Sequence, residues 1–226
     1  MLCLPKKTAP LDFEDAFEVV SVSEFEGVRY LHLGYTDTVQ GAMRIARPFK
    51  LEIEYIRNMM AWEEAYPDDA PPEHIVQLGL GVGSLSKYCW RNYPKSRITA
   101  VEYNPQVIRI CRHLFKLPPD DDRLSVIQAD AGAWVADPQN HATVDVMQVD
   151  LYDAAAKGPV LDTEDFYCKV RACLRAGGIA TINLFGNTTD RRGFDESYAN
   201  IKAAFAGQCY AMPQVPDGNI VVVAQA

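Results

Sequence analysis

Short apolar runs alternate with stretches of helical spacing over the last two-thirds of this chain of 226 residues. Between the runs, apolar side chains recur three or four residues apart, which predicts helices. An alternation of strands and helices predicts a parallel sheet with a helix between successive strands. The five apolar runs that predict its strands are HIVQLGLG (74–81), RITAVE (97–102), LSVIQAD (124–130), VDVMQVD (144–150) and IATINLF (179–185).

The chain closes with two further apolar runs, QCYAMP (208–213) and NIVVVAQA (219–226), joined by Pro216-Asp217-Gly218. This connection is too short for a crossover helix, so these two strands must be antiparallel. The expected fold class is therefore α/β, with a doubly wound, seven-stranded, mostly parallel sheet of the Rossmann-like kind.

The N-terminal part has a different pattern. Residues 17–35 alternate around Glu26-Gly27, which predicts a β-hairpin. Residues 51–66 carry apolar side chains at helical spacing up to a proline-rich turn at 67–72, which predicts one helix. We therefore expect a hairpin and helix element over residues 1–70 and a Rossmann-like nucleoside-binding catalytic domain over residues 71–226.

The composition of the chain limits the kinds of partner that we expect it to bind. No apolar run approaches the length of a membrane span, and MLCLPKKTAP lacks the apolar segment of a signal peptide, so we expect a cytoplasmic protein without a membrane partner. Six cysteines without a CxxC pair indicate reduced thiols and no metal site. The net charge of −8 disfavours nucleic acid and is compatible with a cationic small molecule.

The glycine loop Gly79-Leu80-Gly81-Val82-Gly83 joins the first predicted strand to a helix. Glycines at such a turn let backbone amides approach a ligand closely. Glu102 ends the next strand, where a carboxylate can accept hydrogen bonds from ribose hydroxyls, although a helix N-cap contact is the alternative. The loop lacks the GxGxxG spacing, which disfavours a nicotinamide dinucleotide.

The strand pattern resembles the class I S-adenosylmethionine-dependent transferases over about residues 74–226. This resemblance implies that Asp130, at the end of the third strand, accepts a hydrogen bond from adenine, with Ala131 beside it. The alternative for Asp130 is a helix cap. Ligands of open α/β sheets bind at the carboxyl ends of the strands, so we expect Glu102, Asp130 and Asp150 to converge on one cleft with the glycine loop.

The fourth strand ends in Asp150-Leu151-Tyr152-Asp153, followed by a loop with Gly158-Pro159 and by Phe-Tyr on a helix. The segments QVDLYDAAAKGPVL (148–161) and EDFYCKVRACLRAGG (164–178) resemble the spermidine synthase family. Members of that family are aminopropyltransferases that use decarboxylated S-adenosylmethionine. The resemblance implies an amine acceptor, a donor of this kind and pairing as a homodimer.

The two aspartates are the candidate catalytic residues. An attacking amine must lose a proton, and Asp150 is placed to accept that proton or to orient the amine. Asp153 is then expected to hold a second ammonium group of the substrate. An Asx-turn with Ala155 is the alternative for Asp153.

Three further residues are candidates for substrate binding on the family resemblance. Gln40 follows the hairpin, Tyr55 lies in the predicted helix, and Tyr152 stands between the two aspartates. Asn183 and Asn187, near the end of the fifth strand, are weaker candidates for contact with the acceptor.

Val82 departs from the family pattern, which has an aspartate that contacts the donor's amine at this position of the loop. Lys157 adds a positive charge to the loop after Asp153. Three functions therefore stay open: an aminopropyltransferase with altered substrate recognition, an S-adenosylmethionine-dependent methyltransferase, and a non-catalytic nucleoside- or polyamine-binding protein.

Overall fold

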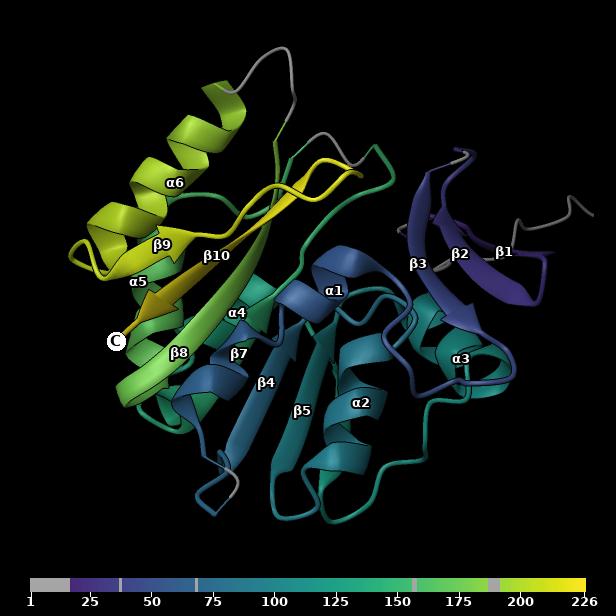
Figure 1. Cartoon of the computed structure of the whole chain (residues 1–226), viewed down its shortest axis with the longest axis horizontal. Coiled ribbons are helices and arrows are strands. Elements are labelled where there is room, and N and C mark those ends of the chain that lie inside the picture. Colours follow the sequence, from purple (N-terminus) through teal and green to yellow (C-terminus); the bar gives the residue numbers. More distant parts are fainter. Residues whose placement is uncertain (1–16, 37, 68, 156–157, 187–191) are drawn as a thin grey trace, which may run out of the picture.

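The computed structural model describes residues 17–36, 38–67, 69–155, 158–186 and 192–226. Its strands form a three-stranded sheet, β1-β2-β3, and a seven-stranded sheet in the order β6-β5-β4-β7-β8-β10-β9 (Figure 1). Neighbours in the larger sheet are parallel, except that β10 is antiparallel to both β8 and β9. The predicted α/β class and the terminal antiparallel pair are confirmed. The strands are β4 (His74–Leu78), β5 (Arg97–Glu102), β6 (Leu124–Gln128), β7 (Val144–Val149), β8 (Leu174–Phe185), β9 (Cys209–Ala211) and β10 (Asn219–Gln225).

The predicted N-terminal hairpin is β1 (Val20–Phe25) and β2 (Val28–Leu33). Glu26 and Gly27 form its turn with φ values of 48° and 74°, a conformation that matches the twist of the two strands. A third strand, β3 (Val39–Arg44), pairs antiparallel with β2 and carries Gln40. The sequence pattern did not predict β3.

Helices cover both faces of the larger sheet. Successive side chains of each strand point to opposite faces, so each strand packs against both helical layers. Ile75 packs with α1, α2, α3 and the N-terminal sheet in one core, and the next residue, Val76, packs with α4, α5 and α6 in the other. In the described part of the chain, no helix is both long enough and apolar enough to cross a bilayer. The helices beyond the N-terminal part are α2 (Ser84–Asn92), α3 (Pro105–Leu114), α4 (Ala131–Ala136), the 3₁₀ turn η3 (Pro138–Asn140), α5 (Glu164–Cys173) and α6 (Arg192–Ala204).

The single helix predicted over residues 51–66 is wrong. The chain forms α1 (Glu54–Asn58) and a separate 3₁₀ helix, η2 (Ala61–Ala65). The carbonyl oxygen of Met59, which would continue the helix, accepts hydrogen bonds from Gln148 Nε2 and Thr181 Oγ1, each at 3.0 Å. Side chains of the sheet therefore take the acceptor that an unbroken helix needs.

Helix α5 begins as predicted, because Thr163 Oγ1 accepts a hydrogen bond from Phe166 N at 3.1 Å. It ends at Cys173, several residues before the predicted stop at Gly177-Gly178. Leu174 already pairs with Val144 of β7, so strand pairing replaces the last predicted helical turn.

Candidate active site

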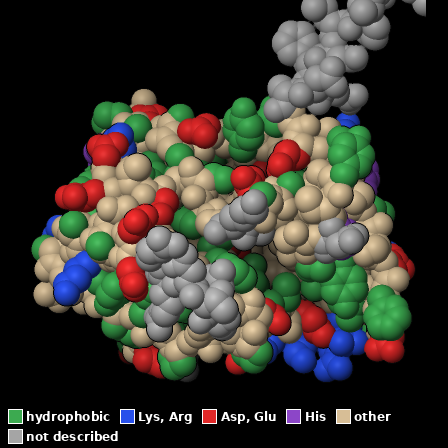
Figure 2. Space-filling model, turned by 90° about the horizontal axis from the view of Figure 1, so that it is seen from above, with side chains coloured by type: hydrophobic (Ala, Val, Ile, Leu, Met, Phe, Trp, Pro, Cys, Tyr) green, Lys and Arg blue, Asp and Glu red, His purple; other side chains and the backbone are tan. Residues whose placement is uncertain are grey.

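A cleft of about 990 Å³ opens at the carboxyl ends of the parallel strands, between them and the N-terminal sheet. Its lining comes from every strand end predicted to converge there and from β2 and β3. Figure 2 looks down on this edge and shows acidic side chains around the central hollow, with the visible Lys and Arg side chains nearer the rim. The predicted site residues in the lining are Gln40, Tyr55, Gly79, Gly81, Glu102, Asp130, Ala131, Asp150, Tyr152 and Asp153.

The glycine loop is shaped by contacts that no other residue type would permit. Gly79 has φ 92°, and a Cβ there would lie 2.2 Å from the carbonyl oxygen of Asp150. Gly81 has φ 52° and also lines the cleft. Gly83, with φ 67°, is instead the N-cap residue of α2 and is outside the lining. Val82 is buried, and its Cγ1 would lie 2.8 Å from a Cβ at Gly41 of β3.

Glu102 is fixed by backbone donors on both oxygens. Leu80 N donates to Oε2 at 3.0 Å and Asn104 N donates to Oε1 at 2.8 Å. Burial raises the pKa of Glu102, and these backbone hydrogen bonds oppose that rise. The helix cap of α3 is Asn104, whose Oδ1 accepts from Gln106 N, so Glu102 holds the cap residue rather than capping the helix itself.

Asp130 caps a helix, which was the alternative role named for it, and it also lines the cleft. Its Oδ1 accepts a hydrogen bond from Ala133 N at 2.8 Å and so caps α4. The side chain is exposed, and Ala131 beside it is buried. A carboxylate can accept several hydrogen bonds, so the cap leaves acceptor capacity for a ligand.

Asp150 lies at the middle of the cleft floor, at the end of β7. Tyr55 Oη donates to its Oδ2 at 3.2 Å, and Asn183 Nδ2 donates to its Oδ1 at 2.8 Å. Burial raises the pKa of Asp150, and the hydrogen bonds from Asn183 and Tyr55 act against the rise. Burial, together with the charge of Asp150, also raises the pKa of Tyr55 well above its ordinary value, so Tyr55 stays a donor. The structure therefore brings Tyr55, Asn183 and Asp150 together from three elements.

Asp153 is exposed, and its Oδ1 accepts from Ala155 N at 2.9 Å, which is the Asx-turn named as its alternative. Gln40 Nε2 donates to the carbonyl oxygen of Asp153 at 3.0 Å, which links β3 to this loop. Tyr152 Oη donates to the carbonyl oxygen of Asn183 at 3.2 Å. Asn187 and Lys157 lie outside the described residues.

The sequence missed two acids of the cleft. Glu18 accepts hydrogen bonds from Ala154 N at 3.2 and 3.1 Å, and Asp217 lies in the turn between β9 and β10. Neither follows a parallel strand, which was the signal used to find the others. Among described residues the lining holds no Lys, Arg or His side chain, and its six carboxylates are Glu18, Glu102, Asp130, Asp150, Asp153 and Asp217.

No group of three or more His, Cys, Asp or Glu side chains with the arrangement of a metal site occurs among the residues that the structure describes. A cleft whose described lining carries carboxylates and no cationic side chains attracts positively charged ligands. A sulfonium compound and an amine both fit this charge pattern.

The strand order, the single antiparallel strand and the glycine loop at the carboxyl ends define a Rossmann-like fold of the class I S-adenosylmethionine-dependent transferases. A family model described as the spermine/spermidine synthase domain matches residues 69–223. The chain belongs to this family, and it is an enzyme of the transferase class.

Comparisons with individual proteins give similar sequences and similar folds. A polyamine aminopropyltransferase of Neisseria meningitidis serogroup A is 36% identical over 211 residues, which cover 93% of this chain and 77% of the relative. A crystal structure of a probable spermidine synthase from Corynebacterium glutamicum has a TM-score of 0.78 at 22% identity, covering 92% of this chain and 77% of its own. Human methyltransferase-like protein 13 in complex with SAH has a TM-score of 0.67 at 24% identity, covering 76% and 82%. At these identities, the two structures show the shared fold alone.

Proposed function

We propose that this enzyme transfers an aminopropyl group from decarboxylated S-adenosylmethionine to an amine acceptor. The observation that carries the proposal is the place of Asp150, on the middle strand β7 of the cleft. Strands β4, β5 and β6 present the glycine loop, Glu102 and Asp130 on one side of it. Strands β8 and β10 present polar and acidic side chains on the other side, where an acceptor amine can approach.

The donor side is built for an adenosyl group. The backbone bonds to Leu80 and Asn104 hold the Glu102 carboxylate in place while leaving lone pairs for the two ribose hydroxyls. Asp130 and Ala131 then meet the adenine, and Gly79 and Gly81 allow close approach of the chain carrying the sulfonium. Donor binding at these residues is part of the proposal.

The charge of the cleft favours the decarboxylated donor. Ordinary S-adenosylmethionine carries a carboxylate, which the six acidic side chains of the lining would repel. The decarboxylated form carries a sulfonium and an ammonium, both of which these side chains attract. Val82 offers no counter-ion from the glycine loop, so we propose that the aspartates of the neighbouring strands supply it.

The transfer is a displacement at the carbon beside the sulfonium. The neutral amine nitrogen attacks this carbon, the new C–N bond forms as the C–S bond breaks, and the electron pair stays on sulfur. Methylthioadenosine leaves as a neutral thioether, and the proton lost by the amine passes to Asp150. A raised pKa makes the Asp150 carboxylate a better proton acceptor. Tyr55 and Asn183 fix the direction in which it faces.

Product analysis tests the proposal. The protein is incubated with putrescine and either donor, and the nucleoside products are separated by chromatography. Methylthioadenosine formed from the decarboxylated donor, in step with the aminopropylated amine, supports the proposal. S-adenosylhomocysteine formed from the ordinary donor would establish the methyltransferase alternative instead. Binding of either donor without turnover across a panel of amines would establish the binding-protein alternative.

Three further proposals concern the domains, the oligomeric state and the location of the protein. They are a division into residues 1–70 and 71–226, a homodimer, and a cytoplasmic location. Analytical ultracentrifugation of the purified chain decides the oligomeric state, with a monomer at micromolar concentration as the outcome against it.

A further inference from the structure

The wall of the cleft beyond Asp150 is formed by β8 and then β10, which follow β7 in the sheet. Asn183 and Phe185 are two residues apart on β8, so their side chains share a face, and both line the cleft. Asn219, at the start of β10, is the pairing partner of Phe185 and lines it too. A continuous wall therefore leads from Asp150 toward the turn between β9 and β10.

Two hydrogen bonds fix the orientation of the polar side chains in this wall. Asn219 Nδ2 donates to Asn183 Oδ1 at 3.0 Å, and Asn183 Nδ2 donates to Asp150 Oδ1 at 2.8 Å. Because an amide oxygen only accepts and an amide nitrogen only donates, this chain of bonds sets the orientation of Asn183. Two successive hydrogen bonds therefore link Asp150, at the end of β7, to Asn219 of β10 by way of Asn183 of β8.

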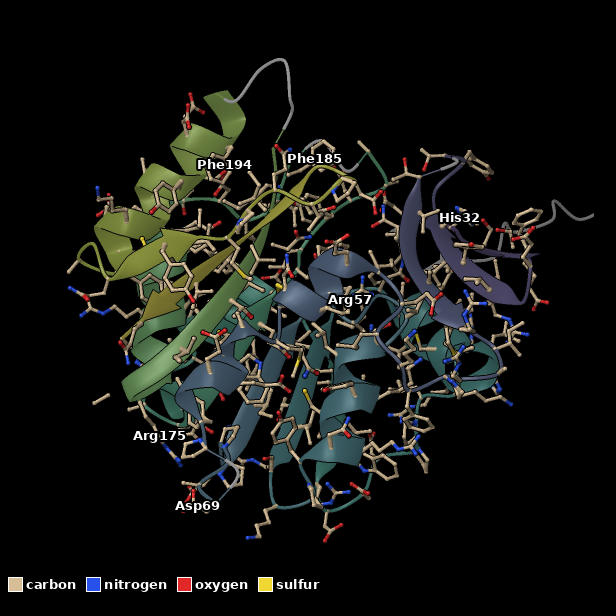
Figure 3. All side chains as sticks on the ribbon, viewed as in Figure 1. His32, Arg57, Asp69, Arg175, Phe185 and Phe194 are labelled. Atoms are coloured by element: carbon tan, nitrogen blue, oxygen red, sulfur yellow. The ribbon has the colours of Figure 1, made fainter. Side chains whose placement is uncertain are left out.

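The turn before β10 is also fixed. Gly218 N donates to the carbonyl oxygen of Val215, and Gly186 N donates to the carbonyl oxygen of Gly218 at 2.8 Å. Gly218 has φ 96°, and a Cβ there would lie 2.9 Å from Cε2 of the Phe185 ring. Figure 3 shows Phe185 at the end of β8, close to the tip of the β9–β10 turn. Asp217, which precedes Gly218, is therefore held at the edge of the cleft.

The Asp217 side chain has no hydrogen-bond or ion-pair partner among the residues that the structure describes. It is exposed and lines the cleft. Phe185, which is 39% exposed, stands on β8, the strand between β7, which Asp150 follows, and β10, which Asp217 precedes. Two strand spacings, about 10 Å, separate β7 from β10. A carboxylate at each end and an aromatic surface between them match two ammonium groups joined by methylenes.

We propose that Asp217 binds the ammonium group of the acceptor that lies farthest from Asp150. This inference rests on the proposed function and assigns to Asp217 the task that the sequence gave to Asp153. Asp153 lies only three residues from Asp150, in the loop after β7, whereas Asp217 lies in the turn before β10, on the acceptor side of the cleft.

Substituting Asp217→Asn and comparing putrescine with n-butylamine tests this assignment. The two amines have the same carbon chain and differ by one ammonium group. The variant should raise the KM for putrescine at least about tenfold and leave kcat/KM for n-butylamine within about twofold of the unchanged enzyme. Asp122→Asn, the same charge change at an exposed position outside the cleft lining, should alter neither. An unchanged KM for putrescine, or equal losses for both amines, would overturn the assignment.

Equilibrium binding separates this inference from the proposed function. Thermal stabilisation by putrescine is measured in the presence of methylthioadenosine, which needs no turnover. Stabilisation that Asp217→Asn abolishes supports the assignment even where the unchanged protein forms no aminopropylated product. Turnover by the unchanged protein, combined with putrescine stabilisation that survives in Asp217→Asn, would leave the proposed function standing and reject the assignment.

Discussion

Two opposed influences act on the pKa of Asp150. Burial favours its protonated form, while donors from Tyr55 and Asn183 favour its ionised form. We propose that this balance lets the carboxylate take a proton from the acceptor amine.

Replacing Asp150 with Asn should lower the transfer rate by at least about 10²-fold, because the amide cannot accept the proton. Methylthioadenosine should still stabilise the variant in thermal unfolding, since the proposed donor site is formed by Glu102 and the glycine loop. Rates are measured by methylthioadenosine release, with Asp122→Asn as the control for loss of one negative charge. Near-normal turnover by Asp150→Asn would remove Asp150 from the chemistry.

Asn183 should set the pH range of the reaction. Its amide donates to the ionised form of Asp150 and so lowers the pKa of that group. Asn183→Ala removes this donor, and the pKa should rise. Because Asp150 acts when ionised, the acid limb of the kcat/KM profile should move to higher pH, while the alkaline limb stays in place. Asn92→Ala, on the surface of α2, is the matched control. An acid limb that does not move would show that Asp150 does not determine it.

Three acids that the sequence predicted for the site share one property. Glu102, Asp130 and Asp150 each follow an apolar run, and parallel strands bring such positions to one edge. Glu18 and Asp217 reach the cleft by other means. Residues 17–19, before β1, and the β9–β10 turn reach the edge through contacts that have no local signature in the sequence.

At the scale of elements, the glycine loop depends on the carbonyl oxygen of Asp150 lying beside Gly79. Gly79→Ala should destabilise the protein by about 1–3 kcal/mol from backbone strain alone, with the 2.2 Å contact adding to this. Equilibrium urea unfolding measures the loss, and binding of methylthioadenosine should weaken in parallel. Gly193→Ala is the matched control, since it lies in α6 with open space around it and should be neutral or slightly stabilising. Equal stability of the two variants would contradict this account of the loop.

Periodicity predicted which segments form strands and helices, and it failed where distant groups compete for the backbone. The break between α1 and η2 arises because Gln148 and Thr181, far along the chain, bond to the carbonyl oxygen of Met59. Residues 51–66 hold no trace of these partners. Strand β3 was missed for a similar reason, since its pairing with β2, rather than an apolar alternation, defines it.

At the scale of the whole molecule, the order of the strands separates the two sides of the cleft to which we assign the reactants. The ends of β4, β5 and β6 form the proposed donor side, the ends of β8 and β10 form the proposed acceptor side, and Asp150 follows β7 between them. The N-terminal sheet closes the cleft from above, with Gln40 bonded to the loop after β7.

The net charge of −8 and the six carboxylates of the cleft should make the capture of acceptors dependent on salt. Ionic strength screens charges over about 8–10 Å, so added NaCl should lower kcat/KM for putrescine. The slope of log kcat/KM against the square root of ionic strength should be about twice as steep for putrescine as for n-butylamine, because the steering force scales with the charge of the ligand. Asp217→Asn should lower the slope for both amines by a similar fraction, because it removes one of the six carboxylates of the lining. Identical slopes for both amines in the unchanged enzyme would mean that apolar contacts with side chains such as Phe185, rather than the acidic lining, decide which acceptor enters.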